Sequence, residues 1–243
     1  MLKHILISML FAAIAVPSVS VADDLTDERI KELVYEAILD NPGIIMEAVR
    51  LLEEQQQQRQ QATAQTVLQD ERNRLERDPN GIVLGNPDGD VTVVEFFDYN
   101  CPYCRRAMPQ VEALIEADPN VRLVYREWPI LGEGSVFAAR AALAALEHGK
   151  YKEFHEAMMV MQGRAEEASV LRIAREVGLD VDQLRQDMQA PEVDEHIQTS
   201  MELTKALGFN GTPSFVIGDE LVPGFVETSV LADYVEATRA AQK

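Results

Sequence analysis

The chain holds only two cysteines, Cys101 and Cys104, and they enclose the dipeptide Pro102-Tyr103. The pair follows the apolar run 91–97, which is typical of a strand, and it opens a stretch with helical periodicity. Because no other thiol is present, a disulfide within one chain must join these two residues. So small a ring removes little entropy from the unfolded chain. A structural cross-link is therefore a poor explanation, and we interpret the pair as a redox-active centre.

The start of a helix is a favourable place for such a centre. Pro102 suits the first helical position, because its missing N–H has no hydrogen-bond partner to lose there. We expect Cys101, at the mouth of the helix, to be the exposed nucleophile and Cys104, one turn inside, to be the resolving thiol. The free N–H groups of the first turn and the helix dipole stabilise a thiolate on Cys101 and lower its pKa, and Arg105 adds positive charge nearby.

Stabilising the thiolate also sets the redox power of the pair, because it stabilises the reduced protein and makes the disulfide a better oxidant. Tyr103 offers a hydroxyl group where a histidine between the cysteines would offer a cation. We therefore expect a milder oxidant than an enzyme with a Cys-Pro-His-Cys centre.

A single carboxylate interrupts the strand that precedes the cysteines. Alternation puts Glu95 on the same face as Val93 and Phe97, and the opposite face is also largely apolar, which predicts a central strand covered on both sides. A carboxyl group buried there has a raised pKa and could exchange protons with a sulfur. Its position six residues before Cys101 allows such an exchange. An ordinary polar residue near a strand end is the alternative.

Metal binding is the main chemical alternative to thiol exchange. A structural zinc site usually needs four ligands, but the chain has no second cysteine pair, and its histidines lie in the N-terminal apolar stretch or on predicted helices. We therefore expect no metal site and no cofactor. Cu(I) is harder to exclude, because two thiolates suffice to hold it and the chain has nine methionines, most of them on apolar helix faces. A non-enzymatic Cu(I)-binding or chaperone protein stays an alternative.

The first residues are typical of a secretory signal peptide. Lys3 precedes the apolar run 5–16, small residues follow, and the run is too short to span a bilayer, so we predict a signal peptide over residues 1–22. This predicts export to the periplasm, where disulfides form and persist. The formal net charge of −19 argues against nucleic acid and anionic membrane as partners.

Residues 23–78 differ in pattern from the rest of the chain. Apolar positions recur at helical spacing before and after Asn41-Pro42-Gly43, which predicts two helices joined by a turn. The Gln-rich stretch 53–61 has good helix formers and little to bury, so it is either a solvated helix or a flexible link. Because an apolar stripe without its own core must bury its face elsewhere, we favour self-association through residues 23–78 over packing on the rest of the chain.

From residue 79 to residue 243 the pattern is that of an α/β domain. A strand at 91–97, a helix from residue 101 and a strand at 121–128 follow one another with short links, which predicts a parallel β-α-β unit. Residues of about 133–208 are helical in character throughout and predict a helical insertion, after which strand character returns at 214–217.

These motifs resemble the DsbA family of thiol-disulfide oxidoreductases over about residues 82–241. The resemblance rests on three stretches: 96–104 around the cysteines, the insertion after Trp128-Pro129-Ile130-Leu131-Gly132, and Gly211-Thr212-Pro213-Ser214-Phe215. It implies a thioredoxin fold with an inserted helical domain, preceded here by the N-terminal helical segment.

The same resemblance implies roles for individual residues. Cys101 is similar to the family's nucleophile, Cys104 to its resolving cysteine and Glu95 to its buried acidic residue. Thr212 and Pro213 resemble the cis-proline loop, which faces the sulfurs and binds substrate backbone in a strand-like manner.

Two departures from prototypical DsbA point to a particular subgroup. The prototype has a histidine between its cysteines and lacks a long N-terminal helical segment, whereas this chain is similar to the subgroup that includes the copper-sensitivity suppressor ScsC. Members of that subgroup can oligomerise and act as isomerases. The resemblance thus implies a homo-oligomeric isomerase or reductase that acts on exported cysteine-containing proteins and is reduced by a DsbD-like membrane protein. A monomeric DsbA-like oxidase with a DsbB-like partner is the alternative.

Overall fold

The computed structural model describes residues 26–242 and separates into two compact units, with the boundary between Glu54 and Gln55. The predicted signal peptide, residues 1–22, lies outside the described residues. The boundary falls inside helix α2 (Gly43–Asp70), earlier in the chain than the limit at residue 78 that the sequence suggests. Residues 55–78 therefore belong to the larger unit.

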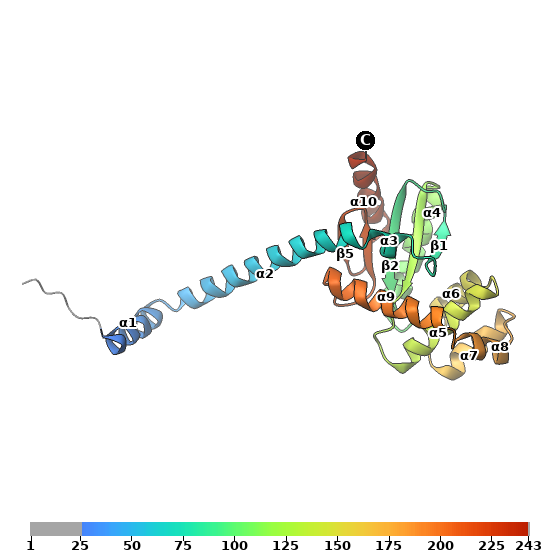
Figure 1. Cartoon of the computed structure of the whole chain (residues 1–243), viewed down its shortest axis with the longest axis horizontal. Helices are drawn as coiled ribbons and strands as arrows, with labels where there is room; N and C mark the ends of the chain where they lie inside the picture. Colours follow the sequence, from blue (N-terminus) through green and yellow to red (C-terminus); the bar gives the residue numbers. More distant parts are fainter. Residues whose placement is uncertain (1–25, 243) are drawn as a thin grey trace, which may run out of the picture. The chain divides into compact units, whose positions relative to one another are not determined.

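The smaller unit consists of α1 (Asp27–Asp40) and the first part of α2 (Figure 1). Thr26 caps α1, since its Oγ1 accepts a hydrogen bond from the Arg29 backbone N–H at 3.3 Å. Asn41 and Pro42 connect the two helices, which confirms the predicted turn. The unit's large apolar side chains are exposed: Ile30, Leu33, Val34, Tyr35, Leu39, Ile44, Ile45, Met46, Val49, Leu51 and Leu52. An exposed apolar surface of this kind is typical of an interaction site that packs against another apolar surface.

A sheet with strand order β1-β3-β2-β4-β5 forms the centre of the larger unit. Its strands are β1 (Ile82–Gly85), β2 (Val91–Phe97), β3 (Val121–Glu127), β4 (Ser214–Ile217) and β5 (Glu220–Pro223). β2 and β3 pair in parallel, and the other neighbours pair antiparallel. Helix α4 (Pro102–Ala117) connects β2 to β3, which confirms the predicted parallel β-α-β unit.

Both faces of β2 are buried, because different helices cover each one (Figure 1). α4 and α10 (Thr228–Ala241) contribute to the core on the face of Val93 and Phe97. Leu68 of α2 and Leu75 of α3 (Arg72–Glu76) pack on the opposite face, together with residues of the last insertion helix. The Gln-rich stretch is helical and exposed, which agrees with the solvated helix that was one of the two expectations.

The predicted helical insertion is confirmed: all regular structure between residues 133 and 208 is helical in the described chain. It comprises α5 (Glu133–Glu147), α6 (Tyr151–Val160), α7 (Glu167–Glu176), α8 (Val181–Asp187) and α9 (Pro191–Leu207). α5 is the most deeply buried of these helices, because its alanines allow neighbouring helices to approach it closely.

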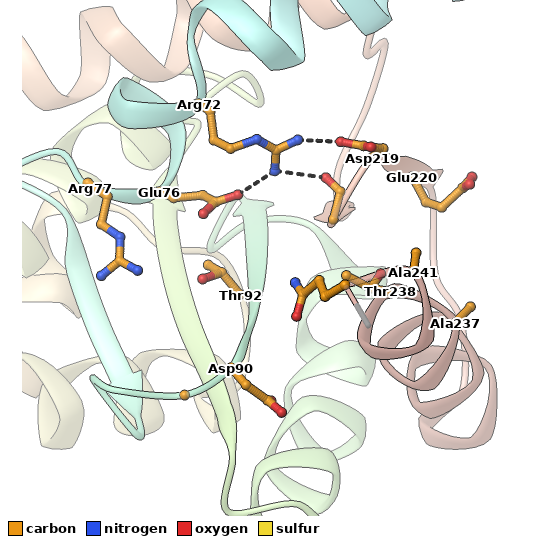
Figure 2. Close-up of a pocket in the computed structure, with 13 residues that line it drawn as sticks. Arg72, Glu76, Arg77, Asp90, Thr92, Asp219, Glu220, Ala237, Thr238 and Ala241 are labelled. Atoms are coloured by element: carbon orange, nitrogen blue, oxygen red, sulfur yellow. Dashed lines mark hydrogen bonds and ion pairs between the residues drawn. The ribbon is translucent and has the colours of Figure 1, made fainter.

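An ionic cluster fastens α3 to the turn between β4 and β5, as Figure 2 shows. Arg72 contacts the Glu76 carboxylate at 2.7 Å, the Gly218 carbonyl oxygen at 3.2 Å and the Asp219 carboxylate. Gln65 of α2 donates a further hydrogen bond to the Asp219 carbonyl oxygen at 3.1 Å. Arg72, Glu76, Gly218 and Asp219 border a cavity of about 560 Å³ that neither cysteine lines, so it is separate from the redox centre.

One glycine permits a close contact between the start of α5 and the loop before α7. A Cβ atom on Gly134 would collide with the Ala165 carbonyl group. We therefore expect Gly134→Ala to lower the free energy of unfolding by about 1–3 kcal/mol, the usual cost of overpacking. Urea unfolding measures this change, and Gly211→Ala, where a Cβ meets nothing within 4 Å, is the matched control. Equal losses in the two variants would contradict the prediction.

Candidate active site

The two cysteines lie at the start of α4. Cys101 is the N-cap residue and Pro102 occupies the first helical position, as the sequence predicts. The Cys101 backbone N–H donates to the Asp98 carbonyl oxygen at 3.0 Å and so closes the turn that leads from β2 into the helix. Both cysteines are free thiols, and Cys104 is completely buried in the core between α4 and the sheet.

The expectation of an exposed Cys101 is wrong, because only 5 % of the residue is exposed. Its Sγ donates a hydrogen bond to the Thr212 carbonyl oxygen at 3.1 Å, and the Thr212–Pro213 bond that follows is cis. The loop before β4 therefore lies against the sulfur, although 111 residues separate Thr212 from Cys101 in the chain. Cys101 is still the more accessible of the two sulfurs.

The surroundings of Cys101 favour its thiolate form. A hydrogen bond from the Cys104 thiol is the largest influence; the pKa of Cys101 falls from 9.0 to about 6 although burial opposes ionisation. A hydrogen bond from the Thr212 side chain and hydrogen bonds from the backbone N–H groups of Cys104 and Tyr103 lower the pKa further. The Thr212 carbonyl oxygen accepts a hydrogen bond only from the neutral thiol, so ionisation of Cys101 removes that hydrogen bond. The donors at the start of α4 outweigh this effect, because the pKa of Cys101 is lowered overall.

Glu95 and Cys104 form a second titrating pair behind Cys101. Burial raises the pKa of the Cys104 thiol above its ordinary range, and Cys101 and the charge of Glu95 add to this effect. Glu95 is 2 % exposed, which confirms its predicted burial, and its Oε2 has no hydrogen-bond partner among residues 26–242. Burial raises the pKa of Glu95 to about 8, and the charge of Cys101 contributes. A thiol that resists ionisation is thus electrostatically coupled to a carboxyl group that titrates near neutral pH.

Asp98 anchors the loop before the cysteines through hydrogen bonds of its carboxylate. We did not predict this role from the sequence. Its Oδ2 accepts hydrogen bonds from the backbone N–H groups of Ile130 and Leu131 at 2.8 and 2.9 Å. Its Oδ1 accepts from the Ser135 hydroxyl at 2.7 Å. The one signal in the sequence is an Asp just after a strand, which is typical of a turn but does not name distant partners.

Asn100 makes a similar connection one residue before Cys101. Its side-chain amide accepts from the Ala165 N–H at 2.7 Å and donates to the Ala165 carbonyl oxygen at 3.1 Å. It also donates to the Ser135 hydroxyl at 3.0 Å. Asp98 and Asn100 together fix the active-site loop to the helical insertion.

The residues predicted to tune the centre have different environments. Tyr103 is 53 % exposed. Arg105 donates to the carbonyl oxygens of Tyr99 at 3.1 Å and Met161 at 2.9 Å. Burial lowers the pKa of Arg105, while the charge of Cys101 opposes that change. Arg105 therefore anchors the loop as well as adding charge.

A buried polar cluster lies beneath the active-site loop. Glu127 Oε1 accepts hydrogen bonds from the hydroxyl groups of Tyr99 at 3.1 Å and Tyr151 at 2.9 Å. The Tyr99 hydroxyl also lies 3.1 Å from His155 Nδ1. Burial raises the pKa of Glu127 and lowers that of His155 to about 3, so the imidazole is neutral. This cluster connects the loop to α6.

Residues 26–242 include no group of three or more His, Cys, Asp or Glu side chains that could hold a metal ion. Within the same part of the chain, no helix has the length and apolar character needed to cross a membrane.

The sheet order, the helical insertion and the paired cysteines facing a cis-proline define a thioredoxin-fold protein. Residues 92–236 match the model of the DSBA-like thioredoxin domain, and residues 28–59 match the N-terminal domain of the copper resistance protein ScsC. The chain belongs to the DsbA-like thioredoxin family and has the fold of the ScsC-like and DsbA-like thiol-disulfide oxidoreductases.

Solved structures of similar proteins share this fold. A thioredoxin-like oxidoreductase from Silicibacter pomeroyi is 70% identical, with a TM-score of 0.69, and the match covers 70% of this chain and 98% of that one. A linker-deletion variant of Proteus mirabilis ScsC is 26% identical, with a TM-score of 0.68 and coverages of 92% and 100%. The thiol-disulfide exchange protein α-DsbA2 from Wolbachia pipientis is 30% identical, with a TM-score of 0.67 and coverages of 73% and 96%.

Curated relatives share only part of their length with this chain. The Na⁺/H⁺ antiporter NhaA 3 of Salinispora tropica is 33% identical over 137 residues, which are 56% of this chain and 21% of the antiporter. NhaA of Herminiimonas arsenicoxydans is 28% identical over 158 residues, or 65% of this chain and 25% of the antiporter. The chain thus spans about a fifth to a quarter of these proteins.

Proposed function

We propose that the protein is a periplasmic thiol-disulfide oxidoreductase that reduces or isomerises disulfides in exported proteins. The observation that carries this proposal is the position of Cys101, a sulfur of lowered pKa at the N-cap of α4 that contacts the cis-proline loop. Cys101 is the nucleophile, Cys104 the resolving thiol and Glu95 the proton acceptor. Thr212 and Pro213 hold the substrate backbone beside the sulfur.

The reaction exchanges bonds between sulfur atoms. The Cys101 thiolate attacks one sulfur of a substrate disulfide, the substrate S–S bond breaks, and the released substrate thiolate takes a proton from solvent. In reduction, Cys104 gives its proton to Glu95 and attacks Cys101 Sγ, which releases the second substrate thiolate and leaves the enzyme disulfide. In isomerisation, a substrate thiolate attacks the mixed disulfide instead and regenerates the Cys101 thiolate without net oxidation.

The reducing direction requires a partner that returns electrons to the enzyme, and we propose a DsbD-like membrane protein. A DsbB-like partner would serve a DsbA-like oxidase instead. The Cys104→Ala variant tests this choice, because it leaves mixed disulfides on Cys101 unresolved. We expect exported proteins and a DsbD-like partner in the trapped complexes. Complexes with a DsbB-like protein alone, together with a wild-type protein that stays oxidised in cells, would overturn the isomerase direction.

Self-association through the smaller unit fits the same function. Its exposed apolar side chains include Val34 and Ile45 on successive helices, and a charge on either one opposes burial. We expect the mature protein to sediment as an oligomer and the double variant Val34→Glu, Ile45→Glu to sediment as a folded monomer. Gln56→Glu, on the exposed polar part of α2, is the control that should leave the mass unchanged. A monomeric wild type would remove this proposal.

Replacing Tyr103 by histidine is expected to make the pair more oxidising. An imidazolium next to Cys101 would stabilise the thiolate and hence the reduced protein. We expect the reduction potential to rise by roughly 30 mV or more, which for two electrons is about a tenfold change in the equilibrium constant. Equilibration with glutathione measures the potential, and Tyr103→Phe, which adds no charge, should stay close to the wild-type value. Equal potentials for all three proteins would contradict this expectation.

A further inference from the structure

Arg106, in the first half of α4, lies between two aromatic rings. Its guanidinium carbon is 5.7 Å from the centre of the Tyr103 ring and 4.6 Å from the centre of the Phe225 ring. Tyr103 precedes Arg106 by three residues on the same side of the helix, whereas Phe225 belongs to the loop after β5. Both distances are within the range of cation–π attraction. The two rings therefore restrict the orientation of a long side chain that is otherwise exposed.

The loop after β5 adjoins the cis-proline loop, which places Arg106 near the reactive sulfur. The Gly224 N–H donates to the Pro213 carbonyl oxygen at 2.9 Å, and the preceding Thr212 carbonyl oxygen accepts from the Cys101 thiol at 3.1 Å. The five residues from Cys101 to Arg106 advance about 7.5 Å along a helix. An extended substrate advances about 3.3 Å per residue. The guanidinium is therefore within reach of substrate residues about two or three positions from the reacting cysteine.

The hydrogen-bond donors of the Arg106 guanidinium have no partner within the described chain. None of the ion pairs or side-chain hydrogen bonds among residues 26–242 involves Arg106, although Glu227 stands only two residues after Phe225. Its neighbour Arg105, by contrast, donates to two backbone carbonyl oxygens. Aromatic rings contact the faces of a guanidinium, but its N–H groups lie in its plane. Stacking thus leaves these groups free to bind a carboxylate, which matches them in a bidentate arrangement.

The overall charge of the protein opposes the binding of acidic peptides. The chain has 41 acidic and 22 basic residues, so its long-range field repels a substrate with the same sign of charge. A cation close to the reacting sulfur offsets this repulsion for a carboxylate that reaches it. The two rings also reduce the entropy cost of that contact, because they order the Arg106 side chain before the substrate binds.

We propose that Arg106 binds a carboxylate of the substrate, two or three residues from the cysteine that reacts with Cys101, and so selects acidic substrate segments. Arg106 transfers no proton and forms no covalent bond in the exchange. It is a specificity-determining residue, and Tyr103 and Phe225 hold its guanidinium in place. This inference rests on the proposed function, because it requires that substrates form a mixed disulfide with Cys101.

Matched peptide disulfides test the inference. Each substrate is a symmetrical disulfide dimer of a short peptide that has one cysteine and a Glu, Gln or Lys two or three residues from it, on either side. The Cys101 thiolate attacks one peptide sulfur, the Cys101–peptide bond forms, the peptide disulfide breaks, and the released peptide thiolate takes a proton from solvent.

The rate of mixed-disulfide formation is measured in the Cys104→Ala protein. Salt at about 0.15 M gives a Debye length of about 8 Å and screens distant charges. We expect the Glu peptide at one or more positions to react roughly two- to fivefold faster than its Gln counterpart, which is the range of an exposed ion pair. The corresponding Lys peptide should react more slowly than the Gln peptide.

Charge reversal at Arg106 distinguishes a local contact from the general charge of the protein. In Arg106→Glu, made in the same Cys104→Ala protein, the preference for the Glu peptide should disappear or reverse. Arg175→Glu changes the net charge equally, at an exposed arginine in the last turn of α7, and should keep the preference. An unchanged preference in Arg106→Glu, or no preference in the Cys104→Ala protein itself, would overturn the inference. If the Cys104→Ala protein formed no mixed disulfide with any peptide, the proposed function would instead be overturned.

Discussion

Exchange of Cys101 for serine is expected to reduce disulfide reduction and isomerisation to the uncatalysed rate. The serine hydroxyl cannot form a mixed disulfide, and it replaces the one sulfur whose pKa is lowered to about 6. Reduction of an insulin-like substrate by glutathione and reactivation of a scrambled disulfide protein measure the two activities. Substantial turnover in the Cys101→Ser variant would refute the assignment of the nucleophile.

The companion variant Cys104→Ser distinguishes the two sulfurs. Because Cys104 is completely buried and its pKa is raised, it should not attack substrates itself. We expect this variant to form mixed disulfides at Cys101 that persist, whereas Cys101→Ser should form none. Equal accumulation in both variants would mean that either sulfur can be the attacking group.

Replacement of Glu95 by glutamine is expected to stabilise the reduced protein increasingly as the pH rises. The folded protein raises the pKa of Glu95 from 4.5 to about 8. The stability associated with the neutral carboxyl group is therefore fully present below pH 4.5 and is lost as the pH rises through about 8. Glutamine does not titrate, so the difference between variant and wild type should grow by up to about 1.4 kcal/mol per pH unit in that window.

Denaturant unfolding of the two reduced proteins across this pH range measures the difference. Cys101 has the opposite linkage, because its lowered pKa adds stability as the pH rises from about 6 to 9. To first order this contribution is common to both proteins and cancels in the comparison. The same Glu95→Gln variant should resolve mixed disulfides more slowly, by ~10²-fold if Glu95 is the direct proton acceptor. A stability difference that stays constant between pH 4.5 and 8 would show that Glu95 is ionised normally.

Local patterns were sufficient to predict the parts of the site that lie close together in the chain. The apolar alternation around Glu95 indicates burial, and a proline after Cys101 indicates a helix start, so the strand, the cap and the helix could be placed from residues 91–117 alone. The insertion was also predictable, because its helices carry helical periodicity and end at glycines such as Gly149 and Gly178.

The features that the sequence did not reveal depend on contacts between distant segments. Thr212 contacts and covers the Cys101 sulfur. Asp98 and Asn100 form hydrogen bonds with backbone groups that are more than 30 residues away in the chain. Leu68 and Leu75 stand in a strongly polar context, so nothing local indicates that they complete the second face of the sheet. Periodicity describes which face of an element is buried, but it does not name the surface that covers it.

The asymmetry of the two sulfurs fits the proposed isomerase activity, because an isomerase begins its reaction with Cys101 as a thiolate. Donors at the start of α4 favour the Cys101 thiolate, whereas the raised pKa of Cys104 keeps that thiol protonated. In the proposed reaction Cys104 keeps its proton until Glu95 accepts it. A mixed disulfide can therefore last long enough for a substrate thiol to attack it before Cys104 resolves it. The balance between these two outcomes depends on how quickly the proton leaves Cys104.

Titration of the ultraviolet absorbance of the thiolate in the reduced protein tests the central claim most directly. The wild type should show a transition with a midpoint near pH 6. This transition should disappear in Cys101→Ser and remain in Cys104→Ala with a higher midpoint, because alanine removes the Cys104 hydrogen bond, which is the largest influence on it. A wild-type midpoint near the ordinary cysteine value of 9.0, unaffected by either substitution, would contradict the account.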